Sequence, residues 1–292
     1  MKGRRLLLAY AVACAASCSS GAAPIDGGAT IGYTKIDDME EASPYPIEWT
    51  PPLDLAPGTW YTATGCGAEG NVLPPPGIVV AGAFVHSVWS YAVLPEAHET
   101  FPGTMSKQAA RVRTTAPLNG VWGANMSLVF AFSGDGSGQI VPTAGSDACP
   151  IVIGAEAAVD LSAYAGVTFW AKGDPAGART VQVMFLDSHT DARGGFCNYI
   201  DPNSPDFCYN GFTASIALTD TFSRYTIDFA SLRQDPNWGY RANPDVLDVQ
   251  HVYQIVFQIT APTCYTDEMC AGGAPPPVSF DIWIDDLYFV NK

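Results

Sequence analysis

The sequence is poor in basic residues. It has 14 Lys and Arg against 29 Asp and Glu, a formal net charge of −15. Three of the basic residues (Lys2, Arg4 and Arg5) lie in an N-terminal signal segment, and without them 11 remain, for a formal charge of −18. Such a chain is repelled by phosphate backbones and by anionic lipid. The composition argues against nucleic acids and anionic membrane surfaces as partners, and it fits a neutral ligand or bound cations.

The chain also lacks a long apolar run. The N-terminal run from Leu6 to Ala16 has 11 residues, too few for a helix across a bilayer core of about 30 Å, and with its basic start it is typical of a secretory signal. Residues 15–18, Ala-Ala-Ser-Cys, resemble a lipoprotein box in which Cys18 is lipidated. We expect a signal peptide over 1–17, a flexible tether over 18–31 and one domain over 32–292. Cleavage at Cys14 or after Ala23 stays open.

Hydrolase motifs are absent. The chain has no G-x-S-x-G and no H-E-x-x-H, and its four histidines are scattered. Residues 65–70 match G-x-G-x-x-G, but three prolines at 74–76 prevent the helix that a dinucleotide site needs. The 29 acidic residues leave a glycosidase carboxylate pair possible. We therefore expect a binding protein rather than an enzyme.

The cysteines indicate an oxidising compartment. Outside the signal there are six, none in C-x-x-C spacing, and an even number in an exported chain predicts disulfides. The simplest pairing is Cys197–Cys208, Cys264–Cys270 and Cys66–Cys149, with other connectivities open.

Helical periodicity is hard to find, whereas short alternating runs recur between Gly, Pro, Asn and Asp. Val181, Val183 and Phe185 alternate with Gln182, Met184 and Leu186. In the same way Tyr253, Ile255, Phe257 and Ile259 alternate with Val252, Gln254, Val256 and Gln258. Such alternation predicts strands with one face on a core. Expected strands cover 33–39, 78–91, 107–115, 121–132, 166–172, 179–187, 212–218, 222–229, 251–260 and 279–290, and the proline-rich stretch 43–58 reads as extended loop. The fold class is therefore all-β, a disulfide-bearing β-sandwich or jelly roll.

Four segments occur in a familiar order. They are Ile36-Asp37-Asp38-Met39-Glu40, the run from Val159 to Gly173, the run from Phe222 to Phe229 followed by Gln234, and the run from Phe280 to Leu287. This order resembles galactose-binding-like jelly rolls, especially family 11 carbohydrate-binding modules in bacterial surface lipoproteins. The resemblance covers about 33–290.

The resemblance implies a sugar-binding groove on one sheet face and a structural calcium ion near the first and last strands. The matching positions are Asp38, Glu40, Asp285 and Asp286. Calcium takes six to eight oxygen ligands, which carboxylates can supply. Met39 stands where the family more often has Phe, and the alternative is that these acids are exposed turn and edge residues.

Candidate ligand contacts gather around the long loop 187–211. Its cysteines, Cys197 and Cys208, would close about a dozen residues. Rings in polar, Gly/Pro/Asn-rich sequence suit stacking on sugars, with polar neighbours binding hydroxyls. The candidates are Tyr199, Tyr209, Trp238, Tyr240, Asp187, His189 and Gln234. Alternatively, these rings pack beneath loops, and the polar residues 187–191 form a turn that the disulfide holds in place. Trp170 and Trp283, both within strands, are expected to be structural.

The function expected is a non-catalytic carbohydrate-binding module on a lipid-anchored or secreted bacterial protein, which holds polysaccharide at the cell surface. We expect a monomer whose membrane contact is the lipid anchor alone. Two alternatives remain: a glycoside hydrolase or other polysaccharide-active enzyme on a β-sandwich, and a structural or adhesion lipoprotein that binds protein.

Overall fold

The computed structural model describes the chain in segments. These are residues 32–40, 56–64, 72–73, 78–80, 83–85, 92–101, 104–118, 123–132, 139–141, 151–153, 157–199, 204–260 and 277–292. Contacts divide the chain into two units, Met1–Thr30 and Ile31–Lys292, and every described residue belongs to the second. No helix in the described segments is long and apolar enough to cross a membrane. Cys18, Cys66, Cys149, Cys264 and Cys270 lie outside them.

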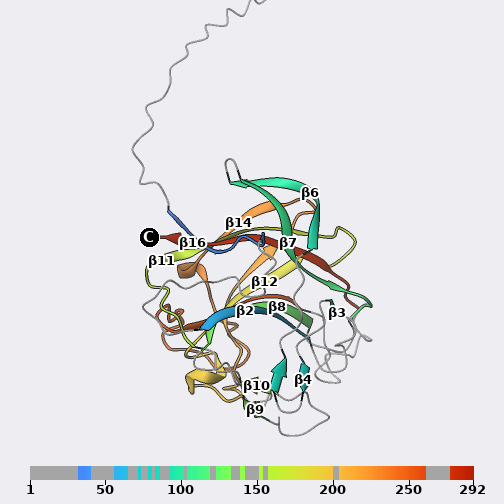
Figure 1. Ribbon diagram of the computed structural model, residues 1–292. Coiled ribbons are helices and arrows are strands. Elements are labelled where there is room, and N and C mark those ends of the chain that lie inside the picture. Colours follow the sequence, from blue (N-terminus) through green and yellow to red (C-terminus); the bar gives the residue numbers. More distant parts are fainter. Residues whose placement is uncertain are drawn as a thin grey trace, which may run out of the picture. The chain divides into compact units, whose positions relative to one another are not determined.

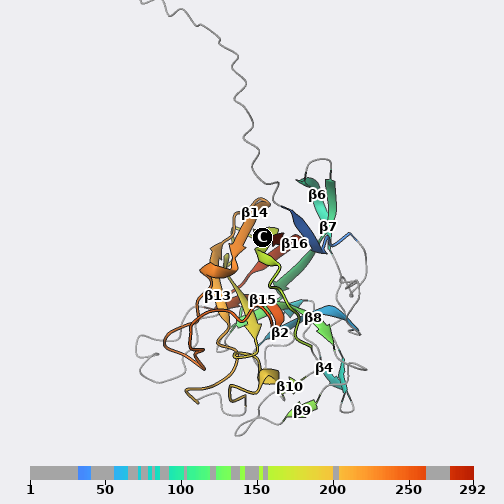
Figure 2. The same cartoon turned by 90° about the vertical axis from the view of Figure 1, so that its left-hand side faces the viewer.

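Two antiparallel sheets form the domain (Figures 1 and 2). The seven-stranded sheet has the order β14-β11-β16-β7-β3, with β1 paired to β16 and β6 to β7. Its strands are β1 (Tyr33–Asp37), β3 (Val72–Leu73), β6 (Ala92–Phe101), β7 (Thr104–Thr114), β11 (Tyr164–Gly173), β14 (Ser223–Asp228) and β16 (Asp281–Asn291).

The five-stranded sheet has the order β13-β12-β15-β8-β2. Its strands are β2 (Ala56–Thr64), β8 (Gly123–Phe132), β12 (Thr180–Asp187), β13 (Phe212–Ala217) and β15 (Val252–Thr260). Two small hairpins stand apart, β4 (Ile78–Val80) with β5 (Ala83–Val85) and β9 (Gln139–Val141) with β10 (Ile151–Ile153). Two 3-10 turns, η2 (Ala192–Gly194) and η3 (Phe229–Ser231), complete the described elements.

The core lies between the two sheets because the alternating apolar residues of both point inward. Phe169 of the seven-stranded sheet meets Phe257 of the five-stranded sheet edge-on, with ring centroids 5.1 Å apart. Phe130 and Phe289 also join the sheets, with tilted rings whose centroids are 5.9 Å apart. From β11 to β16 the chain crosses between the two sheets at every connection except that from β12 to β13, which pair with each other in the five-stranded sheet; this is the manner of a jelly roll. The prediction of an all-β sandwich is confirmed.

Three expectations about strands need correction. The strand expected over 78–91 is a hairpin of β4 and β5 in the described residues, because the chain turns between Val80 and Ala83. The stretch 43–58 was expected to be loop, yet β2 begins at Ala56 and includes Pro57. A proline has no N–H for a ladder, so it is tolerated here because β2 is the last strand of its sheet. Tyr253 was expected to face the core with Ile255, but the register between β12 and β15 shifts at Leu186/Asp187. Val252 is therefore buried in the core, and Tyr253 is half-buried outside it.

Candidate functional site

A row of neutral polar side chains crosses the outer face of the five-stranded sheet. Gln182 of β12 pairs with Ser215 of β13 on one side and with Gln258 of β15 on the other, and Gln258 pairs with Asn125 of β8. The neighbours of these residues along each strand, such as Val183 and Phe257, are buried in the core. The row Asn125, Gln182, Ser215 and Gln258, which we call the amide row, therefore points away from the core.

The amide row lies in the open part of this face, where Met184 and Thr213 are also half-buried and Ala217 and Thr260 are exposed. Asn125, Gln182 and Gln258 are half-buried and Ser215 is exposed. Further along the same face the side chains are at most 2% exposed; these are Ser127, Val129, Leu186, Gln254 and Val256. Amide groups carry both donors and acceptors, so an accessible row of them suits a ligand rich in hydroxyl groups.

Hydrogen bonds fix two amides of the row. The Thr260 hydroxyl donates to Gln182 Oε1 at 3.2 Å, and the Ser127 hydroxyl donates to Asn125 Oδ1 at 3.2 Å. In both cases the carbonyl oxygen of the amide accepts, which leaves the NH₂ group oriented outward as a donor. An orientation set in advance reduces the side-chain entropy lost on binding.

An ion pair that the sequence did not suggest closes one end of this face. Arg193 donates from Nε to Asp191 Oδ1 at 2.5 Å and from Nη2 to Asp191 Oδ2, and its guanidinium lies 5.5 Å from the centroid of the Tyr253 ring. Gln254 Nε2 also donates to Asp191 Oδ2 at 3.3 Å. Asp191 is completely buried. Its carboxylate is therefore held by its partners, with a structural role.

The loop that follows β12 is built on Asp187 and on the disulfide Cys197–Cys208, which the structure confirms. Asp187 is completely buried and accepts hydrogen bonds from His189 N, Thr190 N, Thr190 Oγ1 and Asp248 N. Burial raises the pKa of Asp187, and these hydrogen bonds oppose the shift. Asp187 thus holds the turn together, which agrees with the alternative that residues 187–191 form a turn. Its carboxylate is not placed to touch a ligand.

His189 lies beside this turn. Its Nδ1 is 3.6 Å from Asp187 Oδ2, and its ring centroid is 4.9 Å from that of Phe196. Phe196 is 56% exposed and was not a candidate in the sequence. The exposed Phe196 ring is therefore the more accessible of the two.

The predicted aromatic candidates divide into two groups. Trp238 is 45% exposed, and Phe207 packs edge-on against both Trp238 and Tyr209, with centroids 5.8 Å and 5.9 Å away. The structure therefore brings Tyr209 and Trp238 together through Phe207. Tyr240 is half-buried and packs against the core, and Tyr199 is half-buried with no ring contact to this group among the described residues.

Gln234 and Asn210 hold the loop that carries Trp238. Gln234 is 4% exposed; its Nε2 donates to the carbonyl oxygens of Asn210 and Tyr240, and its Oε1 accepts from Ala242 N. Asn210 Nδ2 donates to the carbonyl oxygens of Asp235, Trp238 and Tyr240. Both the Nε2 and the Oε1 of Gln234 are thus bonded to backbone atoms, and the side chain supports the loop.

The four predicted calcium ligands lie where β1 ends beside β16. Glu40 Oε1 accepts from Ser106 Oγ at 3.0 Å, from Lys107 N at 2.6 Å and from Gln108 N at 3.0 Å. Ser106 Oγ is also 2.6 Å from Asp285 Oδ2. A serine hydroxyl has one proton, so it cannot donate to both carboxylates at once.

Protonation of Asp285 resolves this conflict. Burial raises the pKa of Asp285 to about 8, the nearby charges of Asp286 and Glu40 add to the increase, and the Ser106 hydrogen bond opposes it. A protonated Asp285 can donate to Ser106, which then donates to Glu40. The corner therefore concentrates negative charge that has to be neutralised by a proton or by a cation.

The chemistry of these donors fits calcium, which prefers hard oxygen ligands. In the described part of the chain, however, no three His, Cys, Asp or Glu side chains form a group that could hold a metal ion. Asp38 is turned toward Lys35, whose Nζ lies 3.0 Å from its Oδ2. A calcium ion would have to draw Glu40, Asp285 and Asp286 together.

No known protein family and no curated protein matches the sequence. Among solved structures, the chain is similar to the family 11 carbohydrate-binding module of the cellulosomal cellulase Lic26A-Cel5E of Clostridium thermocellum. The identity is 12%, the TM-score is 0.44, and the match covers 90% of this chain and 96% of that one.

The chain is also similar to two further solved structures. A family 11 module from Clostridium thermocellum in complex with a β-1,3-1,4-mixed-linked tetrasaccharide matches at 11% identity and a TM-score of 0.42, over 90% of this chain and 97% of that one. A family 30 module of the cellulase Cel9D-Cel44B of Clostridium thermocellum matches at 12% and 0.38, over 82% and 95%. The resemblance expected from the sequence agrees with these matches, while the choice of ligand has to be argued from the residues of this chain.

Proposed function

We propose that the outer face of the five-stranded sheet binds a neutral polysaccharide and holds it without covalent chemistry. The observation that carries the proposal is the amide row, which lies in the accessible part of the described face. Amides can donate to and accept from sugar hydroxyls without carrying charge. The one carboxylate described at this face, Asp191, is engaged by Arg193, so the face favours binding over acid–base catalysis.

Trp238 and Phe196 supply the aromatic part of the proposed site. Both are about half exposed; Phe196 lies in the loop between β12 and β13, and Trp238 lies in the loop between η3 and β15. An exposed ring can cover the apolar face of a sugar. These loops lie beyond the closed part of the face at Leu186 and Gln254, so we propose that they contact a different stretch of the polysaccharide from the amide row.

The test is a titration of neutral glycans against a double variant, Gln182→Ala with Gln258→Ala. We expect affinity to fall by about tenfold, because a net hydrogen bond is worth roughly 0.5–1.5 kcal/mol. The matched control is Gln250→Ala, an exposed glutamine of a loop away from the row. Unchanged affinity in the double variant, or release of shortened product during long incubation, would count against the proposal.

We propose that a calcium ion stabilises the corner formed by Glu40, Asp285 and Asp286. The support is the raised pKa of Asp285 and the gathering of hard oxygen donors in a buried place. Bound calcium would neutralise these charges in place of a proton. Thermal unfolding with calcium and with chelator tests this, and identical melting temperatures in the two conditions would remove calcium from the proposal.

We further propose that the protein is exported and anchored through lipid at Cys18, which would place the sheet face at the cell surface. The lipoprotein-like segment 15–18 and the disulfide, a bond typical of oxidising compartments, support this. Metabolic labelling with a fatty acid should mark the native chain and leave the Cys18→Ser variant unlabelled.

A further inference from the structure

The basic residues of this acidic chain are concentrated on one surface. Of the 11 that follow the signal segment, six project from the outer face of the seven-stranded sheet. They are Lys35, Lys107, Arg111, Arg113, Lys172 and Arg224, and we call this surface the cationic face. Their strand neighbours, such as Ile36, Val112 and Ala171, are buried in the core.

An aromatic ring beneath the cations holds two of them in place. Trp283 pairs with Arg111 on one side and with Lys172 on the other. The Arg111 guanidinium lies 4.3 Å and the Lys172 ammonium 5.1 Å from the Trp283 ring centroid, and Lys172 is also 4.9 Å from that of Phe222. Trp283 is only 7% exposed. The cations are thus ordered by cation–π contacts and cover the ring.

Three cations of this surface have no carboxylate partner among the described residues. Arg111 binds Asp281 through two hydrogen bonds. Lys107, Arg113 and Lys172 make no ion pair with any described residue. Carboxylates also lie at this surface. They are Asp281, Asp228 and the buried Asp285 on its strands, Asp38 against Lys35, Asp174 near Arg111, and Glu40, which accepts from the Lys107 N–H.

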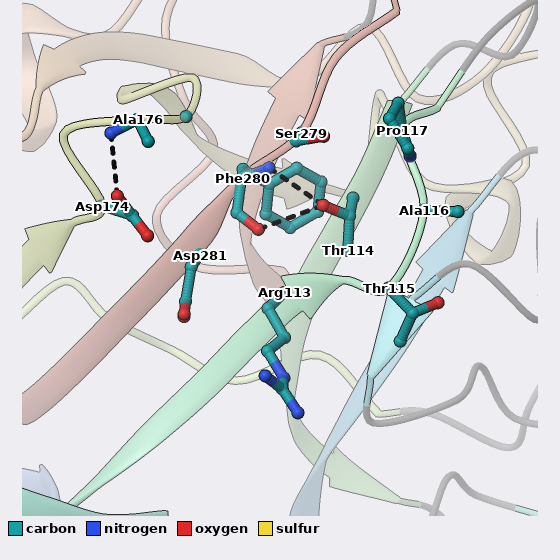
Figure 3. Close-up of a pocket in the computed structure, with 11 residues that line it drawn as sticks. Arg113, Thr114, Thr115, Ala116, Pro117, Asp174, Ala176, Ser279, Phe280 and Asp281 are labelled. Atoms are coloured by element: carbon teal, nitrogen blue, oxygen red, sulfur yellow. Dashed lines mark hydrogen bonds between the residues drawn. The ribbon is translucent and has the colours of Figure 1, made fainter.

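A cavity of about 290 Å³ opens at the end of this surface (Figure 3). Arg113 and Asp281 are paired on adjacent strands, and Figure 3 shows their side chains extending to the same side. Thr115, Asp174 and Ser279 also line the cavity. Hydroxyl and carboxylate groups next to a cation suit a ligand that carries both hydroxyl groups and an acidic group.

We propose that the cationic face binds an acidic polysaccharide, whose sugars carry carboxylate or sulfate groups. Arg111 and Lys172 lie two strands apart, about 10 Å at the usual strand spacing. Double-stranded DNA, by contrast, has one charge per about 1.7 Å, so a more sparsely charged polymer matches these cations better. A membrane surface would call for apolar side chains that insert, whereas the large ring here is covered by cations. The two sheets place this surface on the opposite side of the sandwich from the amide row.

The test compares polygalacturonate with a neutral galactan of equal length, at low and high salt. In the variant Lys172→Gln with Arg113→Gln, affinity for polygalacturonate should fall by about tenfold or more, as charge-assisted hydrogen bonds are lost, and the salt dependence should weaken. Binding of the neutral galactan should not change. The matched control, Arg241→Gln with Lys292→Gln, removes the same charge from exposed positions outside this surface and should keep the native affinity.

Three results would overturn the proposal: equal loss in both double variants, no preference for polygalacturonate over the galactan, or binding of anionic phospholipid vesicles with the same dependence on Lys172 and Arg113. Melting temperatures of both variants show that they are folded. Failure here leaves the neutral-glycan proposal standing, because the latter is tested through Gln182 and Gln258.

Discussion

The outer faces of the two sheets are built by the same alternation and differ completely in chemistry. The five-stranded sheet presents neutral amides, of which Gln182 and Gln258 are side by side. The seven-stranded sheet presents cations ordered on Trp283. Strand periodicity decides only which residues point outward. The identities of the outward residues give the two surfaces different chemistry, and we propose different ligands for them, although the whole chain has a formal charge of −15.

Removal of the Trp283 ring, which lies beneath the cations, is expected to give the largest difference in stability between the two faces. Trp283→Ala should lower the free energy of unfolding by about 3–5 kcal/mol, as large-to-small substitutions of buried aromatic residues do. It should also weaken binding of acidic glycans, since Arg111 and Lys172 lose their support. Chemical denaturation measures the first effect. The comparison is Gln258→Ala on the other sheet. A similar loss of unfolding free energy there would show that outward side chains of the two faces contribute equally to stability.

A second difference concerns pH. The folded pKa of Asp285 is raised to about 8 from 3.8, so in the absence of calcium the folded state holds a proton that the unfolded chain releases above pH 4. Stability should therefore decline as pH rises from about 4 to 8, by a few kcal/mol, because one pKa unit is worth about 1.4 kcal/mol.

The control for this prediction is Asp285→Asn, which removes the titrating group. Its melting temperature should vary less with pH over the same range than that of the native protein, and calcium should flatten the native profile. Affinity for neutral glycans should stay constant across this range, since the amide row has no titratable group. A neutral-glycan affinity that follows the stability profile would contradict the separation of the two regions.

The smallest effect is expected at Gly239, in the loop that carries Trp238. Its φ of +64° is one that L side chains rarely adopt, and an added Cβ would lie 2.8 Å from the Phe207 carbonyl oxygen and from Asn210 Cβ. Gly239→Ala should cost about 1–2 kcal/mol and reduce neutral-glycan affinity, with acidic-glycan binding unchanged. Calorimetric titration with both glycans distinguishes these outcomes. Gly195, also at positive φ but with open space at its Cβ position, is the matched control.

The sequence predicts the sandwich well because alternation is local. The Cys197–Cys208 bridge was also accessible, since the two cysteines are close in sequence. The strand β2 was missed because Pro57 disfavours a strand, and only the position at a sheet edge makes the residue acceptable.

The amide row was not predicted, because it depends on the register of strands far apart in the chain. Nothing near Asn125 in the sequence indicates that its side chain shares a row with Gln258. Gln234 shows the opposite case: it was a ligand candidate from the sequence, and its backbone hydrogen bonds become visible only when the loop is folded.

The hold of Asn210 and Gln234 on the neighbouring loop has a consequence for substitutions there. Within residues 235–242 both side chains bond only to backbone atoms. These hydrogen bonds therefore do not depend on which side chain stands at position 238, whereas Gly239 is required by its backbone conformation. A substitution of Trp238 can change the exposed surface of the loop and keep the hydrogen bonds that support it.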